Sequence, residues 1–186
     1  MVSLTALLLP TLVAAVIVFV LSSVIHTVLT YHRDDFRGLP SEDAVMDALR
    51  GFDLKPGDYV LPYMTAQNMK SEEFKSKVEK GPVAIVTVVP SGMPSMGKSL
   101  IQWFVYCLVV GFFSGYVGAV TLPEGAHYLM VFRVVGTSAF AGYALALAQA
   151  SIWYHKSWSA TARSMADGLV YALVTAGAFG WLWPRG

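Results

Sequence analysis

The most distinctive chemical motif of this sequence is a glycine-rich segment that ends in lysine and serine. Residues 92–99, Gly-Met-Pro-Ser-Met-Gly-Lys-Ser, match the G-x-x-x-x-G-K-[ST] pattern of phosphate-binding loops. The segment also follows a predicted strand and precedes a predicted helix, as such loops do. In a nucleotide site the backbone amides would bind phosphates, Lys98 would reach the terminal phosphate, and Ser99 would bind Mg²⁺.

The surroundings of this motif argue against nucleotide chemistry. The predicted helix after it is apolar enough to cross a membrane, whereas a nucleotide-binding loop needs a helix that packs on a sheet. The chain also lacks the strands of a doubly wound parallel sheet. Nucleotide binding is therefore a remote alternative. The residue types suit an anionic lipid better, because Lys98 can extend to headgroups and the amides of Gly97, Lys98 and Ser99 can bind a lipid phosphate.

Two ionisable residues fall inside the apolar stretches of the chain. Arg133 lies ~10 Å into the third stretch, and Asp167 lies near the start of the fourth, in the opposite leaflet, so we do not expect them to pair. An arginine at the bilayer centre costs about 2.5–3.5 kcal/mol on insertion scales. We expect Arg133 to extend outward to Glu124 or a lipid phosphate, with a partner subunit or an anionic cofactor as alternatives.

The remaining polar residues predict no reaction centre. The histidines and the single Cys107 follow no zinc-binding spacing. His26 and His155 would share one leaflet, as bis-histidine haem ligation needs, but interfacial histidines bonded to backbone, headgroups or water are the simpler interpretation. The acidic pairs at 34–35 and 72–73 are typical of solvated faces. We expect no catalytic residue, no metal and no cofactor, and a non-enzymatic role.

The composition points to lipid as the solvent. Hydrophobic residues make up 55% of the 186 residues, charged residues 13%, and the mean hydropathy is +0.56. Soluble domains are usually about a quarter charged. The formal net charge of +1 leaves no basic excess for binding nucleic acid. These values exclude a disulfide-rich secreted scaffold, a disordered tail and an ordinary cytosolic enzyme.

Four apolar stretches are long enough to cross a bilayer, which takes about 20 residues. The first lacks a positively charged start and is too long for a cleaved signal peptide, so we interpret it as a retained anchor. The predicted organisation is one span within residues 1–30, an insertion over 31–98, and a region 99–186 with spans at about 100–120, 126–153 and 165–183.

Charged residues gather in the insertion. Residues 31–98 hold nine of the 13 basic and ten of the 12 acidic residues, whereas the loop 121–125 has no lysine or arginine. The positive-inside rule places the insertion and the loop 154–164 in the cytoplasm and both chain ends outside.

The insertion itself has the patterns of two short helices and two short strands. We expect helices from Glu42 to near Gly51 and over 72–79, and strands over 59–61 and 83–89. So few elements can bury only a small core. The insertion should therefore rest on the membrane face or on a partner.

Small residues recur every fourth position along the last three spans. Such stripes let helices approach closely in lipid. We expect a compact bundle of spans two to four, with the first span facing lipid or a partner. The predicted packing residues are Gly111, Gly115, Gly142, Ala146, Ala172, Ala176 and Gly180.

Three segments carry a resemblance to known sequences. They are Tyr31–Pro40 (YHRDDFRGLP), Pro90–Leu100 and the terminal Gly-Trp-Leu-Trp-Pro of 180–184. With them, most of the chain resembles a family of four-span bacterial inner-membrane proteins without an assigned activity. The resemblance implies a bacterial inner-membrane location and four spans, and brings no catalytic residue or cofactor.

The sequence thus predicts an all-α membrane protein with four transmembrane helices and a small cytoplasmic α/β insertion between spans one and two. The favoured function is an accessory or scaffolding subunit that packs against other membrane subunits or itself. The alternative is binding of anionic lipid or a small amphiphile at Gly97, Lys98, Ser99 or Arg133. Membrane lipids are expected contacts in either case.

Overall fold

The computed structural model describes residues 2–185, which divide into two units. The helical unit contains the residues up to Phe36 and those from Ser95 on, and the insertion unit contains Arg37–Pro94. The chain is mostly helical, with one small two-stranded sheet. This confirms the expected balance of elements.

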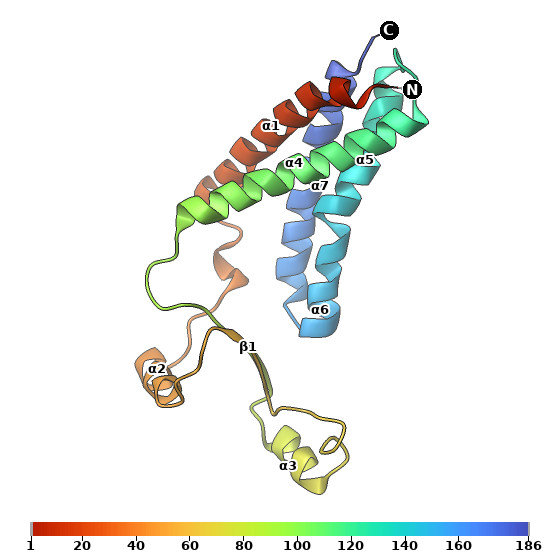
Figure 1. Ribbon diagram of the computed structural model, residues 1–186. Coiled ribbons are helices and arrows are strands. Elements are labelled where there is room, and N and C mark those ends of the chain that lie inside the picture. The colour runs from red at the N-terminus through yellow and green to blue at the C-terminus, as the bar shows by residue number, and fades with distance from the viewer. Residues whose placement is uncertain (1, 186) are drawn as a thin grey trace. The chain divides into compact units, whose positions relative to one another are not determined.

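The helical unit is built from four long apolar segments (Figure 1). Helix α1 packs on α4 and α7, and α5 packs on the same two helices, so neighbouring helices run antiparallel around the bundle. Each segment is long and apolar enough to cross a membrane, which indicates a multi-pass membrane protein. The helices are α1 (Leu8–Val28, after a 3₁₀ turn at Leu4–Leu7), α4 (Met96–Thr121), α5 (Tyr128–Tyr143), α6 (Ala148–Tyr154) and α7 (Trp158–Leu182).

The third segment is interrupted, whereas its sequence predicts one continuous helix. Helix α5 ends at Tyr143, Ala144 has φ −125° and ψ −49°, and a 3₁₀ turn at Leu145–Leu147 leads into α6. Gly168 of α7 lies against this break, since a Cβ there would be 2.9 Å from the Tyr143 carbonyl oxygen. The Tyr106 hydroxyl donates a hydrogen bond to the carbonyl of Gly142 (2.6 Å), which satisfies an acceptor next to the break.

Helix α7 also differs from its predicted bounds. It begins at Trp158, seven residues before the apolar stretch that identified it. Hydropathy measures only the apolar part of a helix, and the added turns carry Ser159, Arg163 and Ser164. The extra turns therefore bring a charged side chain, Arg163, onto the end of the bundle.

One face of helix α1 packs against the other helices of the bundle. Thr11, Ala14, Ala15, Val18 and Ser22 are buried on that face. Trp103 of α4 donates a hydrogen bond from Nε1 to the Ser22 hydroxyl (2.7 Å). The first span is thus as much a core helix as the others, because its alanines and hydroxyl residues provide the close contacts that we expected only of the other spans. Its opposite face exposes Leu8, Leu12, Val16, Val20 and Val24.

Several of the predicted packing glycines lie where helices approach closely. The Phe179 ring occupies the space that a side chain on Gly115 would need. A Cβ on Gly142 would be 3.0 Å from Val110, and one on Gly180 would be 2.7 Å from Tyr128.

The other predicted packing residues have differing surroundings. A Cβ on Gly111 would be at an ordinary 3.5 Å from Thr11. Ala172 and Ala176 are buried in the core, whereas Ala146 is exposed on the 3₁₀ turn. The break in the third segment takes Ala146 out of the stripe that a continuous helix would have formed.

The insertion unit contains two short helices and a hairpin-like sheet. Its elements are α2 (Glu42–Arg50), β1 (Gly57–Leu61), α3 (Glu72–Lys80) and β2 (Ala84–Val88). The strands are antiparallel, with Tyr59 opposite Val86 and Val60 opposite Ile85. Ser71 caps α3 by accepting a hydrogen bond from the Phe74 amide (3.1 Å). No residue of Arg37–Pro94 is buried.

Candidate functional site

A polar cluster lies where the chain after α1 meets the start of α7. Its members, called the polar cluster below, are Tyr31, His32, Asp35, Arg163 and Asp167. The first three follow the end of α1, where a 3₁₀ turn at Arg33–Asp35 places His32 and Asp35 three residues apart on one side. Arg163 and Asp167 are four residues apart on α7 and share one helix face.

His32 occupies the centre of the polar cluster. Its Nδ1 lies 2.6 Å from a carboxylate oxygen of Asp35, and its Nε2 lies 2.7 Å from Asp167 Oδ2. The Tyr31 hydroxyl donates to the other Asp167 oxygen. Arg163 donates from Nε to Asp35 Oδ1 (2.9 Å), and its terminal Nη2 donates to the same oxygen. Both carboxylates are therefore held from two sides.

The central groups of the polar cluster, His32 and the two carboxylates, are largely shielded from water. Asp167 is 4% exposed, and the side chains of His32 and Asp35 are each 15% exposed. Loss of water around the Tyr31 hydroxyl, with its hydrogen bond to the Asp167 carboxylate, raises the pKa of Tyr31 to about 12.

The hydrogen bonds of His32 and its burial shift the pKa of the ring in opposite directions. Burial favours the neutral ring, but the hydrogen bonds to Asp35 and Asp167 outweigh it and raise the pKa of His32. The hydrogen bonds from His32 and Arg163 lower the pKa of Asp35. Both carboxylates are thus placed to bind positive charge.

His26 lies beside the polar cluster near the end of α1. Its ring centroid is 4.8 Å from that of His32, and the planes are tilted by 42°. A nitrogen of His26, a nitrogen of His32 and a carboxylate oxygen of Asp167 all lie within 4.8 Å of one another. His26 is exposed, His32 is half-buried and Asp167 is buried, so the three donors extend from the surface into the bundle.

The predicted phosphate site is an exposed helix start with few free donors. Gly97, Lys98 and Ser99 are exposed in the first turn of α4. The Lys98 amide donates to the Ser95 hydroxyl (3.4 Å), and the Ser99 amide donates to the Ser95 carbonyl (3.3 Å). The strand before the motif, β2, pairs only with β1, and antiparallel, so within residues 2–185 the parallel sheet of a nucleotide-binding fold is absent.

Arg133 and Asp167 have different surroundings. Arg133 is exposed on α5 and forms no ion pair with any residue between 2 and 185, Glu124 included. Asp167 is instead paired with His32 and Tyr31. As expected, the two do not pair. The partners of Asp167 come from the segment just after the first span, outside the apolar stretches.

The sequence carries partial signals for the polar cluster. The end of the first span and the start of the fourth were both predicted on the cytoplasmic side, and each carries ionisable residues. The spacing within each segment is regular, three residues for His32 and Asp35 and four for Arg163 and Asp167. The sequence does not reveal that the first and fourth long helices lie next to each other.

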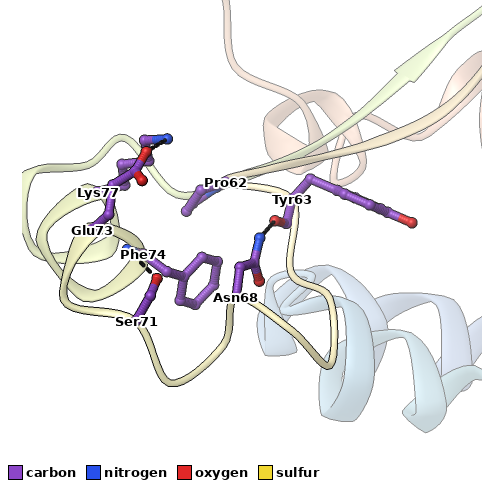
Figure 2. Close-up of a pocket in the computed structure, with 7 residues that line it drawn as sticks. All are labelled: Pro62, Tyr63, Asn68, Ser71, Glu73, Phe74 and Lys77. Atoms are coloured by element: carbon purple, nitrogen blue, oxygen red, sulfur yellow. Dashed lines mark hydrogen bonds and ion pairs between the residues drawn. The ribbon is translucent and has the colours of Figure 1, made fainter.

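The insertion unit contains a cavity of about 250 Å³ between α3 and the segment after β1. Figure 2 shows the Phe74 ring pointing into it and the Tyr63 ring pointing away. Its polar groups are occupied: the Asn68 amide donates to the Tyr63 carbonyl (3.0 Å), and Lys77 pairs with Glu73 (2.6 Å). The cavity therefore presents the apolar Phe74 ring rather than free polar groups.

The helical unit has a second cavity, of about 350 Å³, beside the polar cluster. Asp35 and Phe36 line it together with α6 and the first turns of α7. Lys156 and Ser157 contribute polar groups at its side. Asp35 thus faces both this cavity and the polar cluster.

Comparison with known proteins provides no relative for this site. The chain matches no profile of a protein family, no curated protein and no solved structure.

Proposed function

We propose that this chain is a non-enzymatic accessory subunit of a larger membrane assembly, anchored by its four long helices and docked through residues 37–94. The observation that carries the proposal is that the insertion unit, taken by itself, buries no side chain. Large apolar residues in water cost free energy roughly in proportion to their exposed area. A unit of this kind gains its stability from a surface that covers it.

The sheet of the insertion unit offers a specific docking face. Val60 and Ile85 are opposite each other in the register and are 45% and 44% exposed. Alternation along the chain continues this face to Val83 and Val89, which are 62% and 69% exposed. Between Ile85 and Val89 the face carries Thr87, whose hydroxyl is occupied by a hydrogen bond to Asp58 of β1 (2.7 Å). Four branched apolar side chains on one small sheet are typical of a protein interface.

The charge of the insertion unit favours a protein over an anionic membrane. Residues 37–94 contain eight acidic and seven basic residues. Binding to anionic lipid relies on an excess of lysine and arginine, each of which contributes about 1 kcal/mol near the surface. The insertion unit has no such excess. Its partner is therefore a protein with an apolar surface.

The orientation follows from the distribution of basic residues. We place the insertion unit in the cytoplasm of a bacterial cell and the short 121–125 turn outside, because the turn has no lysine or arginine. The partner then has a cytoplasmic surface beside the membrane.

Photo-crosslinking in native membranes tests this proposal. A photoreactive phenylalanine at Val60 or Ile85 should give the same protein adduct, identified by mass spectrometry. The same residue at Ser76, which is exposed on α3, should not give that adduct. Adducts with lipid alone, or with a second copy of this chain alone, would overturn the accessory role.

A charged substitution on the docking face should release the partner. We expect Ile85→Glu to reduce co-purification of the crosslinked protein at least tenfold, because a carboxylate would have to be buried in an apolar contact. Ser76→Glu adds the same charge on α3 and should leave the yield unchanged. Equal yields from the two variants would contradict the proposed face.

A further inference from the structure

The donors of His26, His32 and Asp167 are close to the geometry of a metal site. Their three donor atoms lie within 4.8 Å of one another. Ligand atoms on a tetrahedral zinc ion, with bonds of about 2.0–2.1 Å, are about 3.4 Å apart. Rotation of His26 can bring its nitrogen nearer, since this exposed side chain forms no hydrogen bond with any residue between 2 and 185. His32 Nε2 and Asp167 Oδ2, which lie 2.7 Å apart, would separate by about 0.7 Å to admit the ion.

The orientation of His32 is that of a metal ligand with its supporting carboxylate. Its Nδ1 is fixed by Asp35 at 2.6 Å, and Asp35 is in turn held by Arg163. Metal-binding histidines almost always donate their second ring N–H to a carboxylate, carbonyl or water, which fixes the tautomer. This arrangement directs Nε2 of His32 towards Asp167.

The contacts of His32 leave one of its ring nitrogens for an ion. Its Nδ1 lies 2.6 Å from Asp35, and its Nε2 lies 2.7 Å from Asp167. A cation between Nε2 and Asp167 would take the place of the hydrogen bond that joins them, while the contact between Nδ1 and Asp35 stays in place. Imidazole nitrogens and carboxylate oxygens are both ligands of divalent transition metals.

We infer that His26, His32 and Asp167 bind a divalent transition-metal ion between the end of α1 and the start of α7. Two imidazoles and one carboxylate suit Zn²⁺ or Fe²⁺ rather than Mg²⁺ or Ca²⁺, which prefer oxygen ligands. Three protein ligands leave a position open for water. The site depends on residues 26–35 and 163–167 alone and is independent of the proposed docking of residues 37–94.

Metal binding by the purified chain tests this inference. The full chain is purified in detergent with a tag that contains no histidine, stripped with a chelator, and titrated with Co²⁺ followed by competing Zn²⁺. We expect one ion per chain, a visible absorption band of nitrogen- and oxygen-bound Co²⁺, and its loss on addition of Zn²⁺. Absence of stoichiometric binding at micromolar metal would overturn the inference.

Substitutions distinguish this site from adventitious binding. His26→Ala removes an exposed ligand without disturbing the core and should weaken binding by about 100-fold or more, whereas loss of the supporting carboxylate in Asp35→Asn should weaken it by about 10–100-fold. The control is His155→Asn, because His155 is an exposed histidine at φ 52°, a conformation that asparagine tolerates. Unchanged affinity in His26→Ala, or an equal loss in His155→Asn, would refute the site.

Discussion

Replacing Asp167 with asparagine in the metal-free protein should lower the free energy of unfolding by about 2–4 kcal/mol. Asp167 is 4% exposed and accepts hydrogen bonds from Tyr31 and His32. Breaking a buried charged pair by removing one partner typically costs about 3–5 kcal/mol, because the other charge stays buried without compensation. The lower figure here reflects the contact of His32 with Asp35, which the variant keeps, and the 15% exposure of the His32 side chain, which lets water screen part of the charge.

The measurement is unfolding of the purified chain in detergent with a chelator present, followed by denaturant or heat. Asp34→Asn is the matched control, because Asp34 lies in the same turn but is exposed and makes no side-chain hydrogen bond within residues 2–185. A loss in Asp34→Asn as large as that in Asp167→Asn would show that the effect comes from net charge rather than from the polar cluster.

Replacing Gly168 with alanine should destabilise the bundle by about 1–2 kcal/mol. A methyl group at this position would lie 2.9 Å from both the Tyr143 carbonyl oxygen and the Ala144 Cβ. The carbonyl belongs to backbone and cannot rotate away, so the two segments must separate. Overpacking of this kind costs about 1–3 kcal/mol and outweighs the gain of up to about 1 kcal/mol from the better helix propensity of alanine.

Gly177→Ala on the same helix isolates the steric cause. A methyl group at Gly177 would meet only the Tyr128 hydroxyl, at an ordinary 3.8 Å, so only the propensity gain remains. Thermal unfolding in detergent should therefore show a lower midpoint for Gly168→Ala and an equal or higher midpoint for Gly177→Ala. The same midpoint for both variants would contradict the close approach of α7 to the break.

The sequence was sufficient to predict the long helices and the elements of the insertion. Each apolar stretch is uncharged or nearly so over the length of a span, and lipid permits few alternatives to a helix there. The elements of the insertion could be predicted from neighbouring residues alone. Ser71 before two glutamates predicts the start of α3, and a run of β-branched residues predicts β2. Patterns of this kind need no knowledge of tertiary contacts.

The features that could not be predicted arise from contacts between distant segments. The sequence around Ala144 contains no proline to mark an interruption, and the close contact of the break is with Gly168, on the next long helix. Asp167 and His32 are 135 residues apart, so their pairing depends on α1 packing against α7. Conversely, the phosphate-loop pattern at Gly97–Ser99 was clear in sequence, but such a pattern has chemical meaning only on a parallel sheet, and β2 has an antiparallel partner.

If residues 37–94 dock as we propose, a copy of this chain synthesised without the docking protein would leave them uncovered in the cell. Segments without a buried core open at little free-energy cost, and such segments are where proteases cut. One cut there leaves α1 separated from the other long helices, a fragment pair held together only by packing in lipid. Under the proposed role, cellular quality control would thus remove copies without a partner, and the abundance of this chain would follow the supply of the protein that it docks on.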